Sequence, residues 1–261
     1  MKLFLSLVTL IFVVPSISAA ESKCEARYRV GLSVEAPFYE LADNGKTSGL
    51  SYELIKELEK HTGCTLNQDP LSIQKATTEL SQYRLDFYAF SAEVPQWNEH
   101  ANFDKVYSSS RMVVVEKKAA GKNKSVADVL KDHSIKITAA VPTVISEAEK
   151  KSLIAQGRYI EASNLEAAFK LLKDKKVQAV IGTPVLSRYH LKLLNLNNEV
   201  RVFHDTNTLM PIGIYSSKKR ISASERERFK KALKEMVADG SLRKVLSKYV
   251  DASDIEQFYK F

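Results

Sequence analysis

The chain is poor in the residues that build metal centres and covalent active sites. Its 261 residues include two cysteines and five histidines, and the histidines are widely separated. No His-Glu-x-x-His metal helix, no nucleophile elbow and no paired cysteine and histidine occur. These absences exclude the familiar signatures of zinc hydrolases and acyl transferases. The sequence therefore predicts a protein that is not an enzyme and that uses no metal and no cofactor.

Apolar runs long enough to cross a bilayer are also missing. A spanning helix needs about 20 apolar residues, and the longest apolar run, residues 3–14, is shorter. A lysine precedes this run, and the small residues Ser18 and Ala20 follow it, which is the pattern of a secretory signal cut before Glu21. We predict that residues 1–20 are a signal peptide and that the mature chain is exported to the periplasm. A retained membrane anchor is the alternative, whereas a lipid anchor lacks the cysteine it needs directly after the small residues.

Acidic residues are outnumbered, but the excess of positive charge is moderate. The chain has 39 Lys and Arg against 31 Asp and Glu, a net charge of +8, which falls to +7 without the leader and its single lysine. A basic balance favours nucleic acid or an anionic surface as a partner. Here the lysines are mixed with Asp and Glu along helical stretches such as 170–176. We therefore predict a solvated surface and no nucleic-acid partner.

The two cysteines are predicted to form a disulfide. In an oxidising compartment a lone pair of cysteines normally joins. Cys24 precedes a strand-like stretch at 28–32, and Cys64 follows a helix and opens the next strand. In a β-α-β unit both lie at the same end of neighbouring parallel strands, within bridging distance. Two separate buried thiols are the alternative.

Strand and helix patterns alternate along the mature chain, which indicates an α/β fold. The clearest helix is 49–61, where apolar residues recur on one face before Gly63 stops it. Another is predicted at 72–83, and two more begin at the capping patterns Ser163-x-x-Glu166 and Ser224-x-x-Glu227. The predicted strands after 28–32 are 86–90, 111–116, 135–141, 159–161, 177–181, 200–203 and 211–215.

A set of short motifs recurs in a recognisable order. The motifs are RVGL at 29–32, PF at 37–38, NGK at 44–46 with GL at 49–50, RLD at 84–86, Phe103 with Tyr107, and ADGSL at 238–242. Their order and spacing resemble the family 3 periplasmic solute-binding proteins, the polar amino-acid receptors of ABC importers. The resemblance covers almost the whole mature chain.

The resemblance implies a two-lobe periplasmic-binding-protein fold of type II. Each lobe would be a mixed sheet flanked by helices, and two hinge strands would let the lobes close over a small ligand. Lobe 1 would comprise residues 21–112 plus 209–261, and lobe 2 residues 113–208. The hinges would lie near 113–116 and 203–208.

Two positions depart from the family pattern. The family has an arginine, which clamps the ligand carboxylate, six residues before the phenylalanine aligned to Phe103; here this position is Trp97. The family also has an aspartate, which holds the ligand ammonium, after the strand aligned to 177–182; here it is Thr183. Leaving a buried charge without a partner costs on the order of several kcal/mol. The ligand is therefore predicted not to be a standard α-amino acid.

Eight residues are the candidates for ligand binding. Trp97 would stack on a flat or cationic ligand, or alternatively pack inside a lobe. Thr143 would offer a hydroxyl and a backbone donor at a helix start, or be an ordinary N-cap. Glu35 or the neighbouring loop residue Glu93 would hold a cation, or be merely solvated, and Phe38 would form a cleft wall or a hydrophobic plug. The full set is Glu35, Phe38, Phe90, Ser91, Ala92, Trp97, Thr143 and Thr183.

The resulting functional prediction is an exported, monomeric solute-binding protein. It would capture a small molecule between its lobes and hand it to an inner-membrane ABC permease. One alternative is a sensory or partner-binding module that kept the fold and lost transport. The other is a dehydratase-like enzyme, an activity known for a few proteins of this fold.

Overall fold

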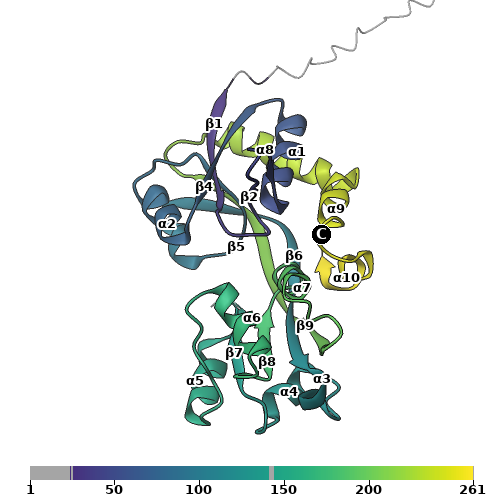
Figure 1. The fold of residues 1–261 in the computed structure, drawn as a ribbon. Helices are drawn as coiled ribbons and strands as arrows, with labels where there is room; N and C mark the ends of the chain where they lie inside the picture. The colour runs from purple at the N-terminus through teal and green to yellow at the C-terminus, as the bar shows by residue number, and fades with distance from the viewer. Residues whose placement is uncertain (1–23, 25, 141–143, 261) are drawn as a thin grey trace, which may run out of the picture.

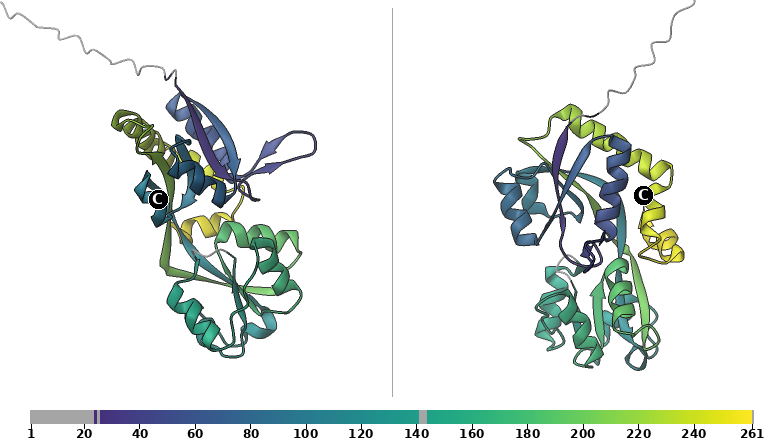
Figure 2. Two further views of the ribbon diagram at one scale, coloured as in Figure 1. Left: turned by 90° about the vertical axis from the view of Figure 1, so that its left-hand side faces the viewer. Right: turned by 45° about the horizontal axis from the view of Figure 1, so that its top comes forward.

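The computed structural model consists of two bodies of sheet and helix joined by two long strands (Figure 1). It describes Cys24 and residues 26–140 and 144–260. The predicted signal peptide lies outside the described residues. Figure 2 shows the same two bodies from two further directions. The predicted α/β, two-lobe fold with two connecting strands is confirmed.

One mixed sheet runs through both lobes, in the order β4-β1-β5-β9-β6-β8-β7, with β10 also paired to β6. A separate hairpin is formed by β2 (Glu40–Leu41) and β3 (Thr47–Ser48). The strands of the large sheet are β1 (Arg27–Ser33), β4 (Thr65–Leu71), β5 (Phe87–Ala92), β6 (Ala101–Glu116), β7 (Ile137–Ala139), β8 (Ala179–Gly182), β9 (Val200–Ser217) and β10 (Tyr259–Lys260). The antiparallel strands β6 and β9, 16 and 18 residues long, connect the lobes.

The pairing of β6 with β9 breaks at one point between the lobes. Ser110 pairs with Leu209, but the next residue, Arg111, pairs with Asp205. Residues 206–208 of β9 are therefore extra, as in a β-bulge, which bends a strand and increases its twist. On one side of the break β9 pairs with β5, and on the other side β6 pairs with β8.

The first predicted hinge segment, 113–116, lies slightly beyond this break. Val113 is fully buried and pairs with Ile181 on one side and Phe203 on the other, so it belongs to the interior of the lobe 2 part of the sheet. A run of valines suits such a central strand better than a hinge. The second predicted segment, 203–208, includes the extra residues of β9. The exact lobe limits, 21–112 plus 209–261 and 113–208, stay a prediction, and the names lobe 1 and lobe 2 follow them.

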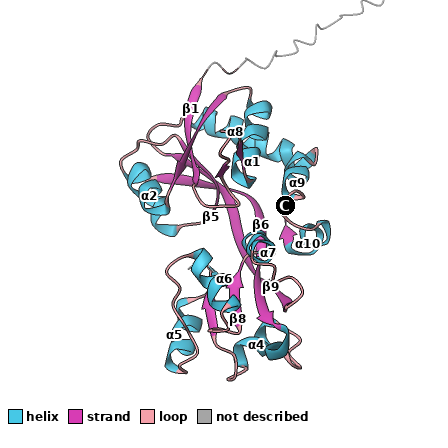
Figure 3. Cartoon of the chain, in the orientation of Figure 1, coloured by secondary structure: helices cyan, strands magenta, loops and turns pink. Residues whose placement is uncertain are grey.

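Lobe 1 packs helices on both faces of its part of the sheet (Figure 3). Helix α1 begins after Gly49 and buries one apolar face, as predicted from its sequence. Gly63 ends it at φ 67°, the left-handed conformation that favours glycine. The helices of this lobe are α1 (Leu50–Thr62), α2 (Ile73–Ser81), the 3₁₀ helix η1 (Pro95–Glu99), α8 (Ala223–Ala238), α9 (Ser241–Leu246) and α10 (Ala252–Phe258).

Lobe 2 has an apolar core on each side of its sheet. Alternate residues of β6 point to opposite faces, so Val113 and Val115 join one cluster and Met112 and Val114 the other. The helices of this lobe are α3 (Lys117–Ala120), α4 (Val126–Lys131), α5 (Glu147–Ala155), α6 (Leu165–Lys173) and α7 (Pro184–Leu193).

Two predicted helix starts were wrong by one or two residues. Asn164, not Ser163, caps α6 by accepting a hydrogen bond from the Ala167 N–H at 2.8 Å. Helix α8 is capped by Ser222, which forms a capping box with Glu225. At the start of α8 the Ser-x-x-Glu pattern occurs twice, beginning at Ser222 and at Ser224. Both begin with serine, so capping preference alone does not decide which one caps the helix.

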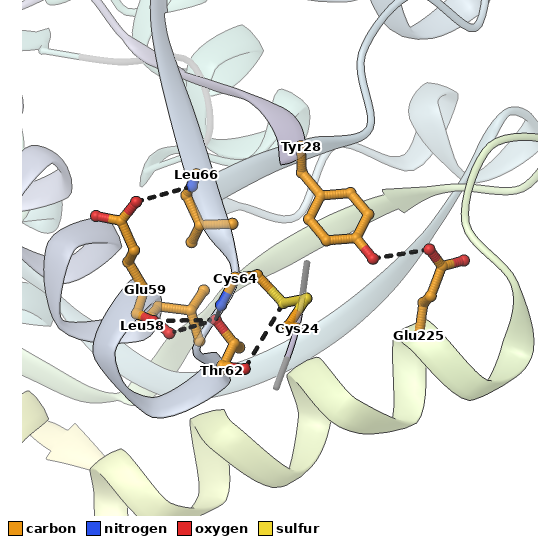
Figure 4. Close-up of a disulfide and its surroundings, with 8 residues drawn as sticks. All are labelled: Cys24, Tyr28, Leu58, Glu59, Thr62, Cys64, Leu66 and Glu225. Carbon is orange, nitrogen blue, oxygen red and sulfur yellow. Dashed lines mark hydrogen bonds between the residues drawn. A yellow bond between two sulfur atoms is a disulfide. The ribbon is translucent and has the colours of Figure 1, made fainter. Parts of the chain in front are cut away.

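The predicted disulfide between Cys24 and Cys64 is confirmed (Figure 4). Parallel pairing of Arg27 with Thr65 brings the two strand starts together, and the Cα atoms of the cysteines are 4.7 Å apart. Beside it, the Tyr28 hydroxyl donates to a Glu225 carboxylate oxygen at 2.7 Å.

The C-terminal segment, residues 252–260, contacts both lobes beside the region where β6 and β9 pass from one lobe to the other, which we call the crossing. Strand β10 pairs with β6 at Ser108 and Ser109. On α10, the buried carboxylate of Asp254 accepts hydrogen bonds from Arg188 of α7 at 2.9 and 3.2 Å. This segment is thus a third connection between the lobes, besides β6 and β9.

The buried Glu79 of α2 makes the stability of lobe 1 depend on pH. A hydrogen bond from Arg29, supported by Lys75 and Arg84, lowers the pKa of Glu79 from 4.5 to about 2. When the pKa of a carboxyl is lower in the folded state than in the unfolded state, its ionised form stabilises the fold at pH values above the unfolded-state pKa. This stabilisation is lost as the pH falls through the folded-state pKa. We therefore expect the free energy of unfolding to decrease between pH 4.5 and about 2, and to decrease less in Glu79→Gln. Urea unfolding across this range measures the difference, and equal slopes for both proteins would contradict it.

Candidate ligand-binding cleft

The carboxyl ends of strands from both lobes meet at the crossing. In lobe 1, Ala92 at the end of β5 pairs with Ile212, which in turn pairs with Tyr107 of β6. In lobe 2, Gly182 at the end of β8 pairs with Met112, five residues further along β6. In open α/β sheets ligands bind outside the carboxyl ends of the strands. The candidate cleft therefore lies between these two edges.

Most of the predicted ligand residues lie at these edges. Glu35 and Phe38 follow β1, Phe90, Ser91 and Ala92 end the parallel strand β5, and Thr183 follows β8. Thr143 lies outside the described residues.

The end of β5 has an unusual backbone. Phe90 is an extra residue between the pairs Ala89–Ile214 and Ser91–Gly213, and it adopts φ 54°. The left-handed backbone conformation costs an aromatic residue on the order of 1 kcal/mol of free energy. Residues strained in this way are common at functional sites. On the partner strand, a Cβ added to Gly213 would lie 2.2 Å from the Asp104 carbonyl oxygen, so only glycine fits there.

Glu35 is an exposed carboxylate at the lobe 1 edge. No ion pair in the described part of the chain involves it. Its charge adds to burial in raising the pKa of Tyr88, so its field reaches this ring. An exposed carboxylate without an ion-pair partner in the described part of the chain suits a cation.

Phe38 contacts both lobes. It is partly buried and packs against the main apolar cluster of lobe 1 and against one apolar cluster of lobe 2. The prediction of a wall and that of a plug are both compatible with this position.

The Thr183 hydroxyl does not cap the helix that follows it. Thr183 is the N-cap residue of α7, and its side chain makes no capping hydrogen bond. Its carbonyl oxygen accepts from the Ser187 N–H at 2.9 Å, so the backbone alone starts the helix. The half-buried hydroxyl therefore remains available at the lobe 2 edge.

Trp97 packs inside lobe 1, which is the second of the two roles predicted for it. Its side chain is 1% exposed, and its indole N–H donates to the Thr77 hydroxyl at 2.9 Å. The rings of Tyr88 and Tyr215 contact it edge-on, each at 5.1 Å between centroids. Because η1 turns this side chain into the core, the stacking role predicted for it is not supported.

Arg111 is a residue of the crossing that sequence reasoning missed. It is 5% exposed, and its two terminal nitrogens are bound to Glu149 at 2.9 and 3.0 Å and to Asp205 at 2.7 Å. Burial acts to raise the pKa of these two carboxyls, but hydrogen bonds, including those from Arg111, outweigh it and lower both. Arg111 is thus neutralised by the protein and offers little attraction to a ligand carboxylate.

A cavity of about 590 Å³ also lies between the lobes, beside α7. Its wall combines Arg188, Tyr189 and Lys192 of α7 with Tyr249 and Asp251 of lobe 1. The Tyr189 hydroxyl also donates to a carboxylate oxygen of Glu40 in lobe 1 at 2.8 Å. None of the predicted ligand residues that the structure describes lines this cavity, but Pro37, the neighbour of Phe38, does.

Two further properties of the described residues bear on other classes of function. No group of three or more His, Cys, Asp or Glu side chains is arranged to hold a metal ion. Within the same residues, every helix is too short or too polar to traverse a bilayer.

Comparison with known proteins identifies the family. Residues 28–252 match the bacterial extracellular solute-binding proteins, family 3. The L-cystine-binding protein TcyA of Bacillus subtilis (strain 168) is 25% identical over 214 residues, 82% of this chain and 76% of the relative. An ancestral arginine-binding protein bound to arginine is 25% identical, with a TM-score of 0.66 over 85% of this chain and 97% of that one. The open L-cystine solute receptor of Neisseria gonorrhoeae, 18% identical, has a TM-score of 0.65 over 86% of this chain and 92% of that one. The chain therefore belongs to the family 3 bacterial extracellular solute-binding proteins, which capture ligands.

Proposed function

We propose that this protein is an exported receptor that captures a small organic cation, such as an amine, and delivers it to an ABC importer. The observation that carries the proposal is the charge at the two strand edges. The lobe 1 edge has the unpaired carboxylate of Glu35, and both positions at which the family pattern holds charged anchors are neutral.

The aromatic surroundings support a cationic ligand. Tyr88 lies within the field of Glu35 but is buried, so the partly buried Phe38, three residues after Glu35, is the aromatic side chain proposed to face the ligand. An ammonium between a carboxylate and aromatic faces gains both ion pairing and cation–π attraction. A second carboxylate, Glu93, is half-buried at the same edge and accepts a hydrogen bond from Asn98 at 3.1 Å.

A ligand carboxylate finds less support. The position of the family arginine is filled by Trp97, which is buried, and Arg111 is bound by two carboxylates. The relatives are named for L-cystine and arginine, but the identity of 25% and the two neutral anchors argue against transferring those ligands. Family membership supports export, a monomeric state and a partner permease.

A thermal-shift screen tests the proposal. The mature protein is heated with diamines, polyamines and quaternary amines, and with L-arginine, L-glutamine, L-cystine and dicarboxylates. A ligand at 100 times its Kd adds about 2.7 kcal/mol of stability, so we expect at least one amine to raise Tm by roughly 5–10 °C.

The other outcomes distinguish the alternative functions. Stabilisation by a plain α-amino acid, with none by amines, would contradict the proposed ligand class. Turnover of a stabilising compound would favour the dehydratase-like enzyme. If no compound of the library raises Tm, the sensory or partner-binding module is favoured.

A further inference from the structure

Exposed cations gather at the end of lobe 2 that points away from the cleft. We name this set of nine residues the basic tip. It comprises Lys117, Lys118, Lys122, Lys124, Lys136, Lys173, Lys175, Lys176 and Arg201. Figure 1 shows α3 and α4, which belong to this end, far from α7 and α10.

The topology brings these residues together from four chain segments. The end of β6 leads into α3, where the Lys117 N–H donates to the Glu199 carbonyl beside the start of β9. On the other side of β6, the Glu116 N–H donates to Gln178, whose own N–H donates to the Lys136 carbonyl. These strand ends therefore lie at one edge of the lobe 2 sheet. The edge opposite to them is the one that faces the cleft.

The positive charge of the basic tip is largely uncompensated. All nine cations are exposed, and none of them takes part in an ion pair within the part of the chain that the structure describes. Three carboxylates, Glu116, Asp174 and Glu199, stand in the same segments. Two nearby carboxylates contribute further negative charge: Asp128 accepts a hydrogen bond from the Lys124 backbone N–H, and Asp132 accepts one from the Asn123 side chain at 3.0 Å. A clear positive excess remains.

The chemistry of the basic tip favours an anionic lipid surface over other polyanions. Eight of its nine cations are lysines, compact and strongly hydrated charges that lack the fork with which arginine grips single phosphates. The aromatic ring beside it, Phe203, is buried and already lies under Arg201 at 5.2 Å, so it offers no free face for the base stacking that single-stranded nucleic acid requires. None of the large apolar side chains exposed among the described residues belongs to these segments, whereas protein interfaces are enriched in apolar and aromatic anchors and depleted in lysine.

We infer that the basic tip holds the protein, by charge alone, against the surface of a bilayer that contains anionic phospholipid. Clusters of four to eight Lys and Arg beside a membrane-spanning helix or on an amphipathic helix bind anionic lipid, and the basic tip gathers a similar number of cations through the fold. Attachment through the tip leaves the strand-end cleft on the far side of lobe 2 open to solvent. This property is independent of the ligand that the cleft takes.

Vesicle co-sedimentation tests the inference directly. The mature protein is mixed with phosphatidylcholine vesicles that contain no or about one third phosphatidylglycerol, at low salt and at 0.5 M NaCl. We expect sedimentation only with the anionic vesicles and its loss at high salt, because screening shortens the range of the field from about 10 Å at 0.1 M toward 3 Å at 1 M.

Two triple variants locate the effect. Lys118→Glu, Lys122→Glu and Lys176→Glu together reverse part of the tip and leave Lys175, whose φ is 58°, unchanged. The control makes the same charge change at exposed lysines elsewhere, Lys46, Lys151 and Lys244. We expect the tip variant to lose roughly tenfold or more in vesicle partitioning, and the control to lose much less. Circular dichroism verifies that both variants are folded.

Three results would overturn the inference. One is equal binding to neutral and anionic vesicles. Another is an equal loss in both triple variants, which would indicate net charge rather than the tip. The third is tight binding to single-stranded DNA or to an acidic polypeptide with no binding to anionic vesicles.

Discussion

Replacing Trp97 with alanine is expected to lower the free energy of unfolding by about 3–5 kcal/mol, the usual cost of removing a buried tryptophan. The side chain is 1% exposed and contacts Tyr88 and Tyr215. Its indole N–H donates to Thr77, inside lobe 1. Ligand affinity should therefore stay unchanged. Urea unfolding followed by circular dichroism measures the first effect, and calorimetric titration with the best amine of the screen measures the second.

Two milder variants separate packing from ligand contact. Trp97→Phe retains a ring and loses the hydrogen bond to Thr77, with an expected cost of about 1–3 kcal/mol. Thr77→Val removes the acceptor and leaves the indole in place. A tenfold loss of affinity in a well-folded Trp97→Phe protein, without a similar loss in Thr77→Val, would show that Trp97 contacts the ligand and would contradict the packing role.

Removing the disulfide should cost about 4 kcal/mol of unfolding free energy by the chain-entropy estimate. The bond joins cysteines 40 residues apart and ties the first strand of lobe 1 to its neighbour, β4. The double variant Cys24→Ser, Cys64→Ser is compared with the wild type in urea, with and without reductant. We expect the reduced wild type and the double variant to unfold at the same lower urea concentration.

The comparison also contains its own control. Reductant should have no effect on the double variant, because it has no other cysteine. If the wild type unfolds at the same urea concentration with and without reductant, the disulfide contributes nothing to stability and the prediction fails.

The features that the sequence predicts well depend on local signals. The apolar face and the terminal glycine of α1 lie within 14 residues of chain, so periodicity and capping suffice to find them. The disulfide follows from one β-α-β unit. The order of family motifs then predicts the two-lobe arrangement, which no local pattern contains.

The long connecting strands illustrate what local signals miss. The lobe 1 half of β6 includes the buried residues Ser108, Ser109 and Ser110, which lie before the predicted strand 111–116. They are in a strand because β9 and β10 supply hydrogen-bond partners from far along the chain. Arg111 is buried for the same kind of reason, since its carboxylate partners are 38 and 94 residues away.

The candidate site shows a second limit of sequence reasoning. The family pattern aligned Trp97 with a cleft position, but the direction of a side chain depends on the backbone path of η1. Similarly, the lysines of the basic tip look dispersed and balanced along the sequence. Only the sheet topology brings them to one end of lobe 2.

Titration of wild-type protein and Glu35→Gln with the best amine tests the proposed cation site most directly. The exposed carboxylate of Glu99 on η1 provides a matched control, Glu99→Gln. Loss of a charge-assisted contact worth about 3 kcal/mol would weaken binding roughly 100-fold in Glu35→Gln, with little change in the control. Equal affinities in all three proteins, or tight capture of a plain α-amino acid in place of the amine, would contradict a cleft built around Glu35.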